Sequence, residues 1–247
     1  MAVRFSGSLL TEALEAELAV IRYSGDTVPE LALPQRRGTA GPLSGEPSGD
    51  TVGVRWVTEG KIKEGTLAMI AGASPGERLW LGMFYLADRE VIDAIVEAAQ
   101  RGVDVRLILD PNENAFGQQK IGLPNRPVAA ELLERVPQGL ELRWYNTTEE
   151  QYHIKTLLIE GRERSLLTTG STNYTRRNLA DLNLEANIEV SAPNDTVVMQ
   201  SAIAHFERLW HNADAEFTLP YEAYEEKLPW VKQTLYRFQK FFAFTTY

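Results

Sequence analysis

Three absences narrow the class of this protein. The chain has 247 residues and no cysteine, which excludes a disulfide scaffold, thiolate catalysis and zinc sites with cysteine ligands. No window of 18 apolar residues occurs, so no membrane-spanning helix is predicted. The first residues lack the basic region, apolar run and cleavage site of a signal peptide. With 44% hydrophobic residues, the chain still has enough apolar surface to bury a core.

Basic residues are also scarce. The sequence has 25 Lys and Arg against 34 Asp and Glu, a formal net charge of −9. Non-specific binding to nucleic acid draws most of its affinity from neutralising phosphates, so this balance disfavours a nucleic-acid partner. A local basic site remains compatible with it.

Composition divides the chain into three parts. Residues 1–24 pattern as a short strand over residues 2–5, followed by a helix over residues 9–23 with leucines at helical spacing. Residues 25–53 are rich in Gly, Pro and Ser and predict a flexible linker. Residues 54–247 have the pattern of an α/β domain.

Strands and helices alternate in this third part. A nearly continuous apolar run over residues 78–86 predicts a buried strand. Asp88 can cap a helix that stops at Gly102, and residues 103–109 predict the next strand, which completes a β-α-β unit. The other predicted elements are helices over residues 128–135 and 194–210 and strands over residues 140–145, 153–160, 165–169 and 186–190.

Two further features each allow two interpretations. Residues 229–247 are dense in aromatics with interleaved Lys and Arg, which favours a docked C-terminal helix over a membrane-surface contact. Asp110 follows a predicted strand and is close to Asn112 and Glu113, which favours a turn over a metal site.

One of the three histidines stands in a chemical context. His205 and His211 lie in or just after an amphipathic helix and are interpreted as ordinary surface or half-buried side chains. His153 precedes Lys155 by two positions, so on a strand both side chains point to the same face.

A second pair of polar residues follows the next predicted strand. Ser171 and Asn173 are also two apart, and two adjacent strands would present an imidazole, an ammonium, a hydroxyl and a carboxamide to one point. This set is typical of a phosphate site in which a neutral imidazole attacks phosphorus and forms a phosphohistidine. Glu185 is the best candidate for the acceptor that orients the imidazole of His153.

The run H-x-K, four residues, an acid, then G-S-x-N resembles the H-x-K-x4-D signature of the phospholipase D superfamily. Glu160 stands where the family usually has Asp. Over residues 54–210 the chain is similar to the second half of bacterial phospholipase D-like proteins related to cardiolipin synthases. The resemblance implies an α-β-α sandwich with a central mixed sheet, no metal and no cofactor. It assigns catalytic roles to His153, Lys155 and Glu185, phosphate binding to Lys155, Ser171 and Asn173, and a structural role to Glu160.

Members of this superfamily work with two facing motifs, and this sequence contains one. One histidine is the nucleophile, and the other protonates the leaving alcohol. Residues 3–24 resemble residues 188–210, which follow the motif, so we expect residues 1–24 to be the end of a preceding half whose motif lies upstream. The alternative is a natural one-motif chain that completes its site as a homodimer.

The leading functional prediction is a phosphodiesterase or phosphatidyltransferase that acts on phospholipids, peripheral to the bacterial cytoplasmic membrane. One alternative is a homodimeric endonuclease of the same superfamily, which would need a basic groove; Arg126, Arg176 and Arg177 are the candidates for it. Another is a catalytically incomplete half that serves as a binding or regulatory module.

Overall fold

The computed structural model describes residues 3–4, 7, 9–27, 51–115, 118–119, 122–148 and 150–224. The helices are α1 (Leu9–Tyr23), α2 (Gly60–Gly72), α3 (Arg89–Gln100), α4 (Asn125–Arg135), α5 (Arg176–Leu179), α6 (Val197–Trp210) and the 3₁₀ turn η1 (Tyr221–Tyr224). The strands are β1 (Gly53–Thr58), β2 (Arg78–Met83), β3 (Asp104–Leu109), β4 (Asn114–Ala115), β5 (Gln118–Gln119), β6 (Leu140–Tyr145), β7 (Lys155–Glu160), β8 (Arg164–Gly170), β9 (Ala186–Pro193) and β10 (Thr218–Pro220).

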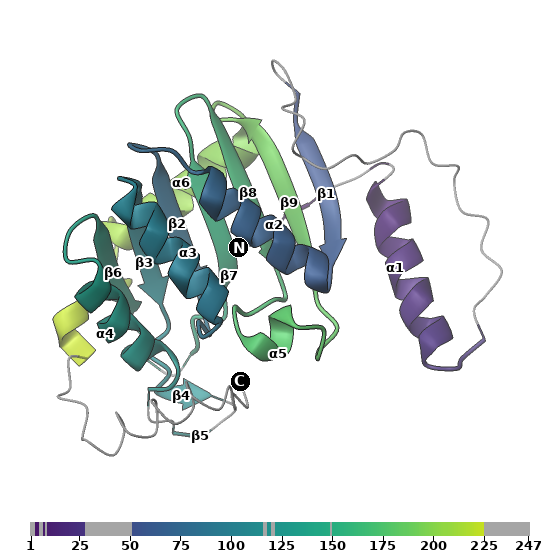
Figure 1. Cartoon of the computed structure of the whole chain (residues 1–247), viewed down its shortest axis with the longest axis horizontal. Coiled ribbons are helices and arrows are strands. Elements are labelled where there is room, and N and C mark those ends of the chain that lie inside the picture. The colour runs from purple at the N-terminus through teal and green to yellow at the C-terminus, as the bar shows by residue number, and fades with distance from the viewer. Residues whose placement is uncertain are drawn as a thin grey trace.

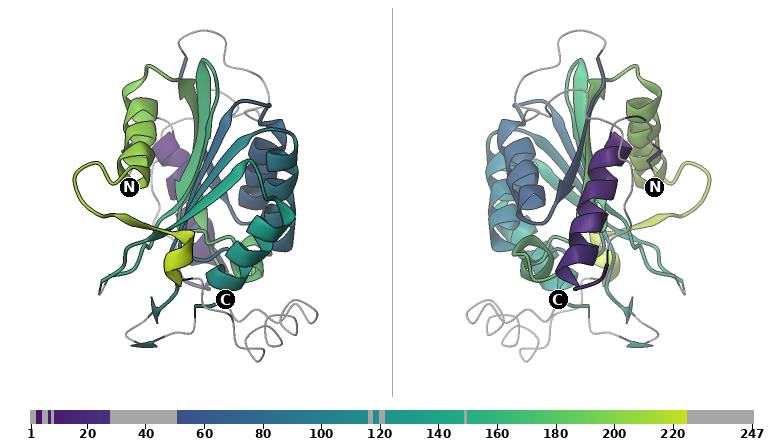
Figure 2. Two further views of the ribbon diagram at one scale, coloured as in Figure 1. Left: turned by 90° about the vertical axis from the view of Figure 1, so that its left-hand side faces the viewer. Right: turned by 90° about the vertical axis from the view of Figure 1, so that its right-hand side faces the viewer.

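A mixed eight-stranded sheet forms the centre of the molecule, in the order β1-β9-β8-β7-β2-β3-β6-β10. β2, β3 and β6 run parallel, and the other neighbours pair antiparallel. Helices α2, α3 and α4 cover one face of the sheet and α6 covers the other, as the face and edge views show (Figures 1 and 2). The predicted α-β-α sandwich with a central mixed sheet is therefore confirmed.

Two apolar clusters fill the space on either side of the sheet. β2 lies near the middle, and its alternating side chains serve both clusters. Leu79 and Leu81 belong to the cluster beneath α2, α3 and α4, while Trp80 belongs to the cluster beneath α6. Trp80 stacks on Phe206 of α6 at a centroid distance of 5.5 Å. Because both faces of β2 are buried, its sequence is an almost unbroken apolar run.

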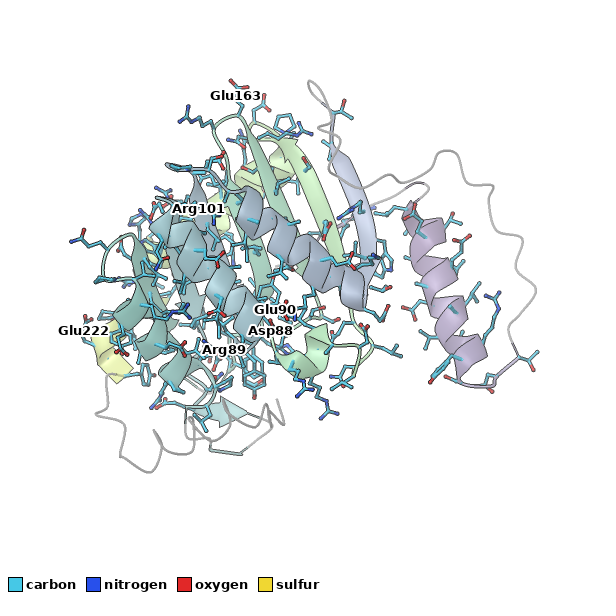
Figure 3. The ribbon with its side chains drawn as sticks, viewed as in Figure 1. Asp88, Arg89, Glu90, Arg101, Glu163 and Glu222 are labelled. Atoms are coloured by element: carbon cyan, nitrogen blue, oxygen red, sulfur yellow. The ribbon has the colours of Figure 1, made fainter. Side chains whose placement is uncertain are left out.

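The predicted β-α-β unit forms as β2, α3 and β3. The Asp88 carboxylate accepts from the backbone N–H groups of Glu90 and Val91 at 3.1 and 3.2 Å and so caps α3. Gly102 ends the turn after α3 with a φ of +95°, a conformation that glycine adopts without strain. Figure 3 labels Asp88 and Glu90 at one end of this helix and Arg101 at the other.

Other expectations concern the two ends of the chain. The helix predicted over residues 9–23 is α1, which lies beside the edge strand β1 (Figure 1). Val3 and Arg4 are not in a strand, contrary to the strand expected over residues 2–5. Most of the predicted linker, residues 28–50, and the predicted tail helix over residues 229–247 lie outside the described residues.

One expectation at the motif is wrong: His153 does not lie in a strand. β7 begins at Lys155, two residues after it. The backbone N–H of Tyr152 bonds to the side chain of Asp110 instead of to a neighbouring strand, at 2.7 Å. Regular pairing is reached only where Ile154 accepts from the N–H of Phe84, at 3.0 Å. Strand alternation therefore does not decide where the imidazole points.

Candidate active site

The motif residues gather at one edge of the sheet. The end of β2 pairs with the start of β7, where Met83 lies opposite Lys155. The end of β8 lies next to it, with Thr169 opposite Thr156. Antiparallel pairing thus brings together three segments: the end of β2, the start of β7 and the turn that follows β8. Figure 1 shows this edge beside α5.

His153 lies exposed at the rim of this edge. Its ring meets Phe84 edge-on at a centroid distance of 4.8 Å, and its backbone carbonyl accepts from the Lys155 ammonium at 3.2 Å. Partial burial lowers the pKa of His153, and the positive charge of Lys155 lowers it further. The imidazole is therefore mainly neutral near pH 7, which is the form that can attack phosphorus.

Lys155 is the buried cation of the site, with 5% of its surface exposed. Its ammonium lies 5.3 Å from the centroid of the Phe84 ring. Burial lowers the pKa of Lys155 to about 8, against the opposing effect of the negative charges of Glu185 and Asp110. The side chain is thus mostly positive at neutral pH and suited to a phosphate oxygen.

Asn173 is held by the segment that follows β2. Its carboxamide oxygen accepts from the backbone N–H of Tyr85 at 3.2 Å, and the next residue, Tyr174, donates its N–H to the carbonyl of Tyr85 at 3.0 Å. With the oxygen used in this way, the NH₂ group is the end that Asn173 can offer to a ligand.

Ser171 and Glu185 form a pair beside these groups. The Ser171 hydroxyl donates to one carboxylate oxygen of Glu185, and the Asn178 amide donates to the other. Among the hydrogen bonds of the described residues, none joins Glu185 to His153. The orienting role of Glu185 stays a prediction, and its charge acts here on Lys155.

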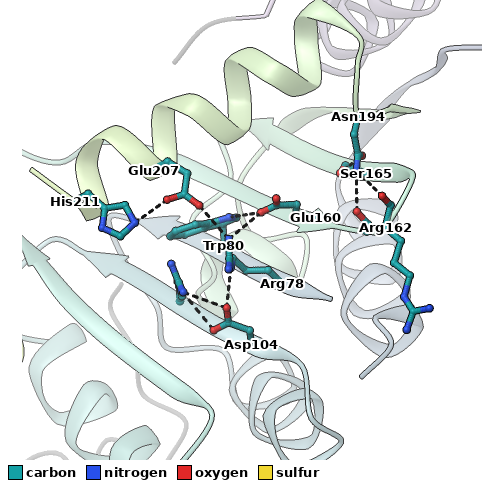
Figure 4. A network of polar contacts seen from close by, with 11 residues as sticks. Arg78, Trp80, Asp104, Glu160, Arg162, Ser165, Asn194, Glu207 and His211 are labelled. Atoms are coloured by element: carbon teal, nitrogen blue, oxygen red, sulfur yellow. Dashed lines mark hydrogen bonds and ion pairs between the residues drawn. The ribbon is translucent and has the colours of Figure 1, made fainter. Parts of the chain in front are cut away.

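Glu160 lies at the opposite end of β7, away from the site. Its carboxylate accepts from the indole N–H of Trp80 at 3.0 Å and from Arg78 at 3.5 Å (Figure 4). Arg78 also pairs with Asp104 at 2.7 Å and with Glu207 of α6 at 3.0 Å. Glu160 is thus placed to join strands and a helix at the far edge, which is consistent with a structural role.

A cavity of about 370 Å³ opens beside the imidazole. Tyr145 and Tyr152 stack on each other in its wall at a centroid distance of 4.5 Å. His153 and Lys155 border it from β7 and the segment before it, and α6 borders it from the other side. A group bound in this cavity would therefore lie against both His153 and Lys155.

Two of the three arginines proposed for a basic groove bond to neighbouring side chains. Arg126 is 8% exposed and pairs with Glu113 at 2.6 Å. Arg177 donates to the side chain of Asn183 at 2.9 Å. These contacts do not favour a groove that neutralises many phosphates.

The described part of the chain contains neither a candidate metal cluster nor a candidate membrane-spanning helix. Within the described ranges, no group of three or more Asp, Glu or His side chains is placed to hold a metal ion. The Asp110 carboxylate instead accepts from the N–H of Asn112 at 2.7 Å, as a turn requires. No helix in these ranges is long and apolar enough to cross a membrane.

Phe84 is the site residue that sequence reasoning missed. It contacts both His153 and Lys155, but in the sequence it is one of several apolar residues at the end of a buried strand. Nothing in its local pattern distinguishes it from a core side chain. Its place at the site follows only from the pairing of β2 with β7.

Comparisons with known proteins agree with this geometry. The family described as cardiolipin synthase, PLD-like domain, matches residues 66–210. The fold is similar to Nuc of Salmonella typhimurium, a phospholipase D family member, with a TM-score of 0.51, 20% identity, and 65% of this chain and 95% of that chain covered. It is similar to NucT of Helicobacter pylori, with a TM-score of 0.52, 14% identity and coverage of 69% and 99%.

A third solved structure comes from a larger protein. Phosphatidylserine synthase of Haemophilus influenzae has a TM-score of 0.56 and 16% identity, and the match covers 79% of this chain and 47% of that one. At these identities the likeness concerns the fold. Among curated proteins, sequence comparison finds no match.

Proposed function

Because the chain belongs to the phospholipase D superfamily, as a cardiolipin synthase-like domain, we propose that it is a phosphodiesterase or phosphatidyltransferase acting on phospholipids through a covalent phosphohistidine. The observation that carries the proposal is one juxtaposition. A neutral, exposed imidazole at His153 lies next to a buried ammonium at Lys155, and the amide of Asn173 is held at the same edge of the sheet.

The reaction proceeds in two displacements. A ring nitrogen of His153 attacks phosphorus, the bond to one ester oxygen breaks, and the departing alcohol takes up a proton. Lys155 and Asn173 bind the non-bridging oxygens and stabilise the charge that grows on them. Water or a second alcohol then attacks the phosphohistidine, gives up its proton and breaks the bond from phosphorus to nitrogen. His153 is released, and the phosphatidyl group leaves as a phosphomonoester when water attacks or as a new phosphodiester when an alcohol attacks.

The proton transfers require a second acid-base group. Within the described residues, His205 borders the cavity beside His153 but lacks the neighbouring lysine of the motif. We therefore assign the second group to another motif-bearing copy, supplied by a homodimer or by an upstream half. Such a group protonates the leaving alcohol and then deprotonates the incoming one.

Turnover on two substrates tests this proposal. The purified chain is given phosphatidylglycerol vesicles or single-stranded DNA, with His153→Ala as the control. We expect lipid turnover that His153→Ala abolishes. An acid-labile phosphate adduct that appears on rapid quenching of the parent chain, and not of His153→Ala, would support the covalent step. DNA cleavage without lipid turnover would replace the lipid proposal with the endonuclease. Vesicle binding without turnover would favour a binding module.

A further inference from the structure

A buried polar cluster lies behind the motif, outside the groups that would touch substrate. It consists of Asp110, Asn112 and Asn125, each of them at most 1% exposed. The Asn125 amide donates to the carbonyls of Phe84 and Asp110, both at 2.8 Å. The Asn112 amide donates to the same Phe84 carbonyl at 2.9 Å. The cluster therefore holds the segment that carries the Phe84 ring.

The carboxylate of Asp110 reaches a second segment of the site. Its Oδ1 accepts from the backbone N–H of Asn112 at 2.7 Å, within its own turn. Its Oδ2 accepts from the backbone N–H of Tyr152 at 2.7 Å, 42 residues further along the chain. That N–H belongs to the residue directly before His153. One buried carboxylate thus joins the end of β3 to the backbone beside the imidazole.

Asp110 also contributes a buried negative charge that acts on Lys155. Among the described residues it forms no ion pair, and burial raises the pKa of its carboxyl. Its negative charge is among those that favour the ammonium form of Lys155. A buried carboxylate costs free energy unless it is hydrogen-bonded. Asp110 has two backbone N–H partners, and these bonds make the carboxylate tolerable at this depth.

We propose that Asp110 is a positioning residue for this active site: it fixes the backbone that carries His153 and supplies negative charge toward Lys155. The inference rests on the proposed function, in which these two side chains act on the phosphodiester. It makes the acid at the end of β3 part of the supporting structure of the reaction rather than a simple turn former.

Asp110→Asn removes the charge with little change in shape. A carboxamide has one acceptor oxygen and one NH₂ group, so one of the two backbone N–H groups loses its acceptor. The matched control is Asp104→Asn at the opposite end of β3, where the carboxylate pairs with Arg78 at 2.7 Å and with Arg106 at 3.3 Å, far from the motif. Both variants remove one carboxylate from the same strand.

Binding of inorganic sulfate, measured by calorimetry across pH, is the first readout. Sulfate is a tetrahedral oxyanion whose charge is constant over this range, so loss of binding at alkaline pH reports Lys155. We expect binding to weaken near pH 8 in the parent chain, where Lys155 loses its proton, and at a lower pH in Asp110→Asn. Asp104→Asn should keep the parent midpoint. Equal midpoints in both variants would overturn the electrostatic part of the inference.

Turnover is the second readout. We expect kcat to fall about 10- to 100-fold in Asp110→Asn with a smaller change in KM, because a misplaced nucleophile loses reaction geometry more than binding. Asp104→Asn should stay near the parent rate. Asp110→Glu keeps the charge and shifts its position, so it should keep the sulfate midpoint and lose rate. If Asp110→Asn does not fold, Asp110→Glu provides the test through its two expected results, an unchanged sulfate midpoint and a reduced rate. A parent rate in Asp110→Glu would overturn the positioning role.

Failure of the proposed function is visible separately. Lys155→Met in the parent background should abolish sulfate binding. If it does not, the phosphate site itself is wrongly assigned. If it does, and Asp110→Asn behaves like Asp104→Asn in both readouts, only the role of Asp110 is wrong.

Discussion

At the scale of single residues, the site depends on the contrast between one exposed and one buried nitrogen. His153 at the rim can be reached by substrate, while Lys155 lies beneath it against the Phe84 ring. Burial lowers both pKa values, and in each case it disfavours the charged form. The neutral, nucleophilic form of the imidazole is therefore more populated. The ammonium of Lys155 loses its proton at a lower pH than an ordinary lysine does.

The first residue-scale prediction is a bell-shaped pH profile. The pKa of His153 is lowered from its ordinary 6.5, so activity should rise as the imidazole loses its proton at a pH below that ordinary value. Activity should fall again near pH 8, where Lys155 loses its charge. The measurement is kcat/KM from about pH 5 to about pH 9 on the parent chain. A profile that stays flat across the alkaline side would contradict the role of Lys155.

A second prediction concerns Asn173, whose amide is proposed to bind the phosphate. Asn173→Ala removes a fixed donor, and kcat should fall about 10²- to 10³-fold, as is usual for such donors. Asn183→Ala is the matched control, because its side chain accepts from the exposed Arg177 and, among the described residues, bonds to none of the motif residues. Steady-state kinetics on the same substrate compare the two. Equal losses in both would place Asn173 outside the phosphate site.

At the scale of elements, β7 connects two edges with different tasks. Its first residue belongs to the active site, and its last, Glu160, belongs to the network of Arg78 and Trp80 at the far edge. The K-x4-acid part of the motif, from Lys155 to Glu160, is therefore the length of this strand. A charged residue at its end ties β7 to β2 and, through Arg78, to α6.

This arrangement predicts a stability effect without a catalytic one. Glu160→Ala leaves the Trp80 indole N–H and one Arg78 contact without an acceptor, so the free energy of unfolding should fall by about 1 to 3 kcal/mol. Glu163→Ala is the control: it is exposed in the turn between β7 and β8 (Figure 3), and its effect should stay within about 0.5 kcal/mol. Urea unfolding gives the energies. A large loss of kcat in folded Glu160→Ala would mean that the network also serves the site.

At the scale of the whole molecule, the motif lies at one edge of the sheet, and the sequence contains one copy of it. In the proposed mechanism, a dimer partner or an upstream half supplies the second acid-base group. The dimer predicts that activity per chain rises with protein concentration, because the complete site forms only on association. Turnover over a dilution series, together with sedimentation velocity at the same concentrations, tests it. Constant activity per chain from a monomer would contradict the need for a second copy.

Much of the architecture could be predicted from the sequence, because local periodicity and capping determine it. The apolar run of β2, the Asp88 cap and Gly102 predicted a β-α-β unit that the structure contains, and the helix at Leu9–Tyr23 has the predicted bounds. The motif residues were also predicted from their spacing. These features depend on residues that are close together in the chain.

Only the tertiary structure decided how the site is assembled. The N–H of Tyr152 bonds to Asp110, and His153 lies outside β7. The Phe84 ring contacts both His153 and Lys155, and Glu185 bonds to Ser171 and Asn178. The contacts of Asp110 with Tyr152, and of Phe84 with His153 and Lys155, join segments at least 42 residues apart. The local sequence pattern indicates which side chains a strand carries. Sheet pairing and packing decide which of those side chains contact one another.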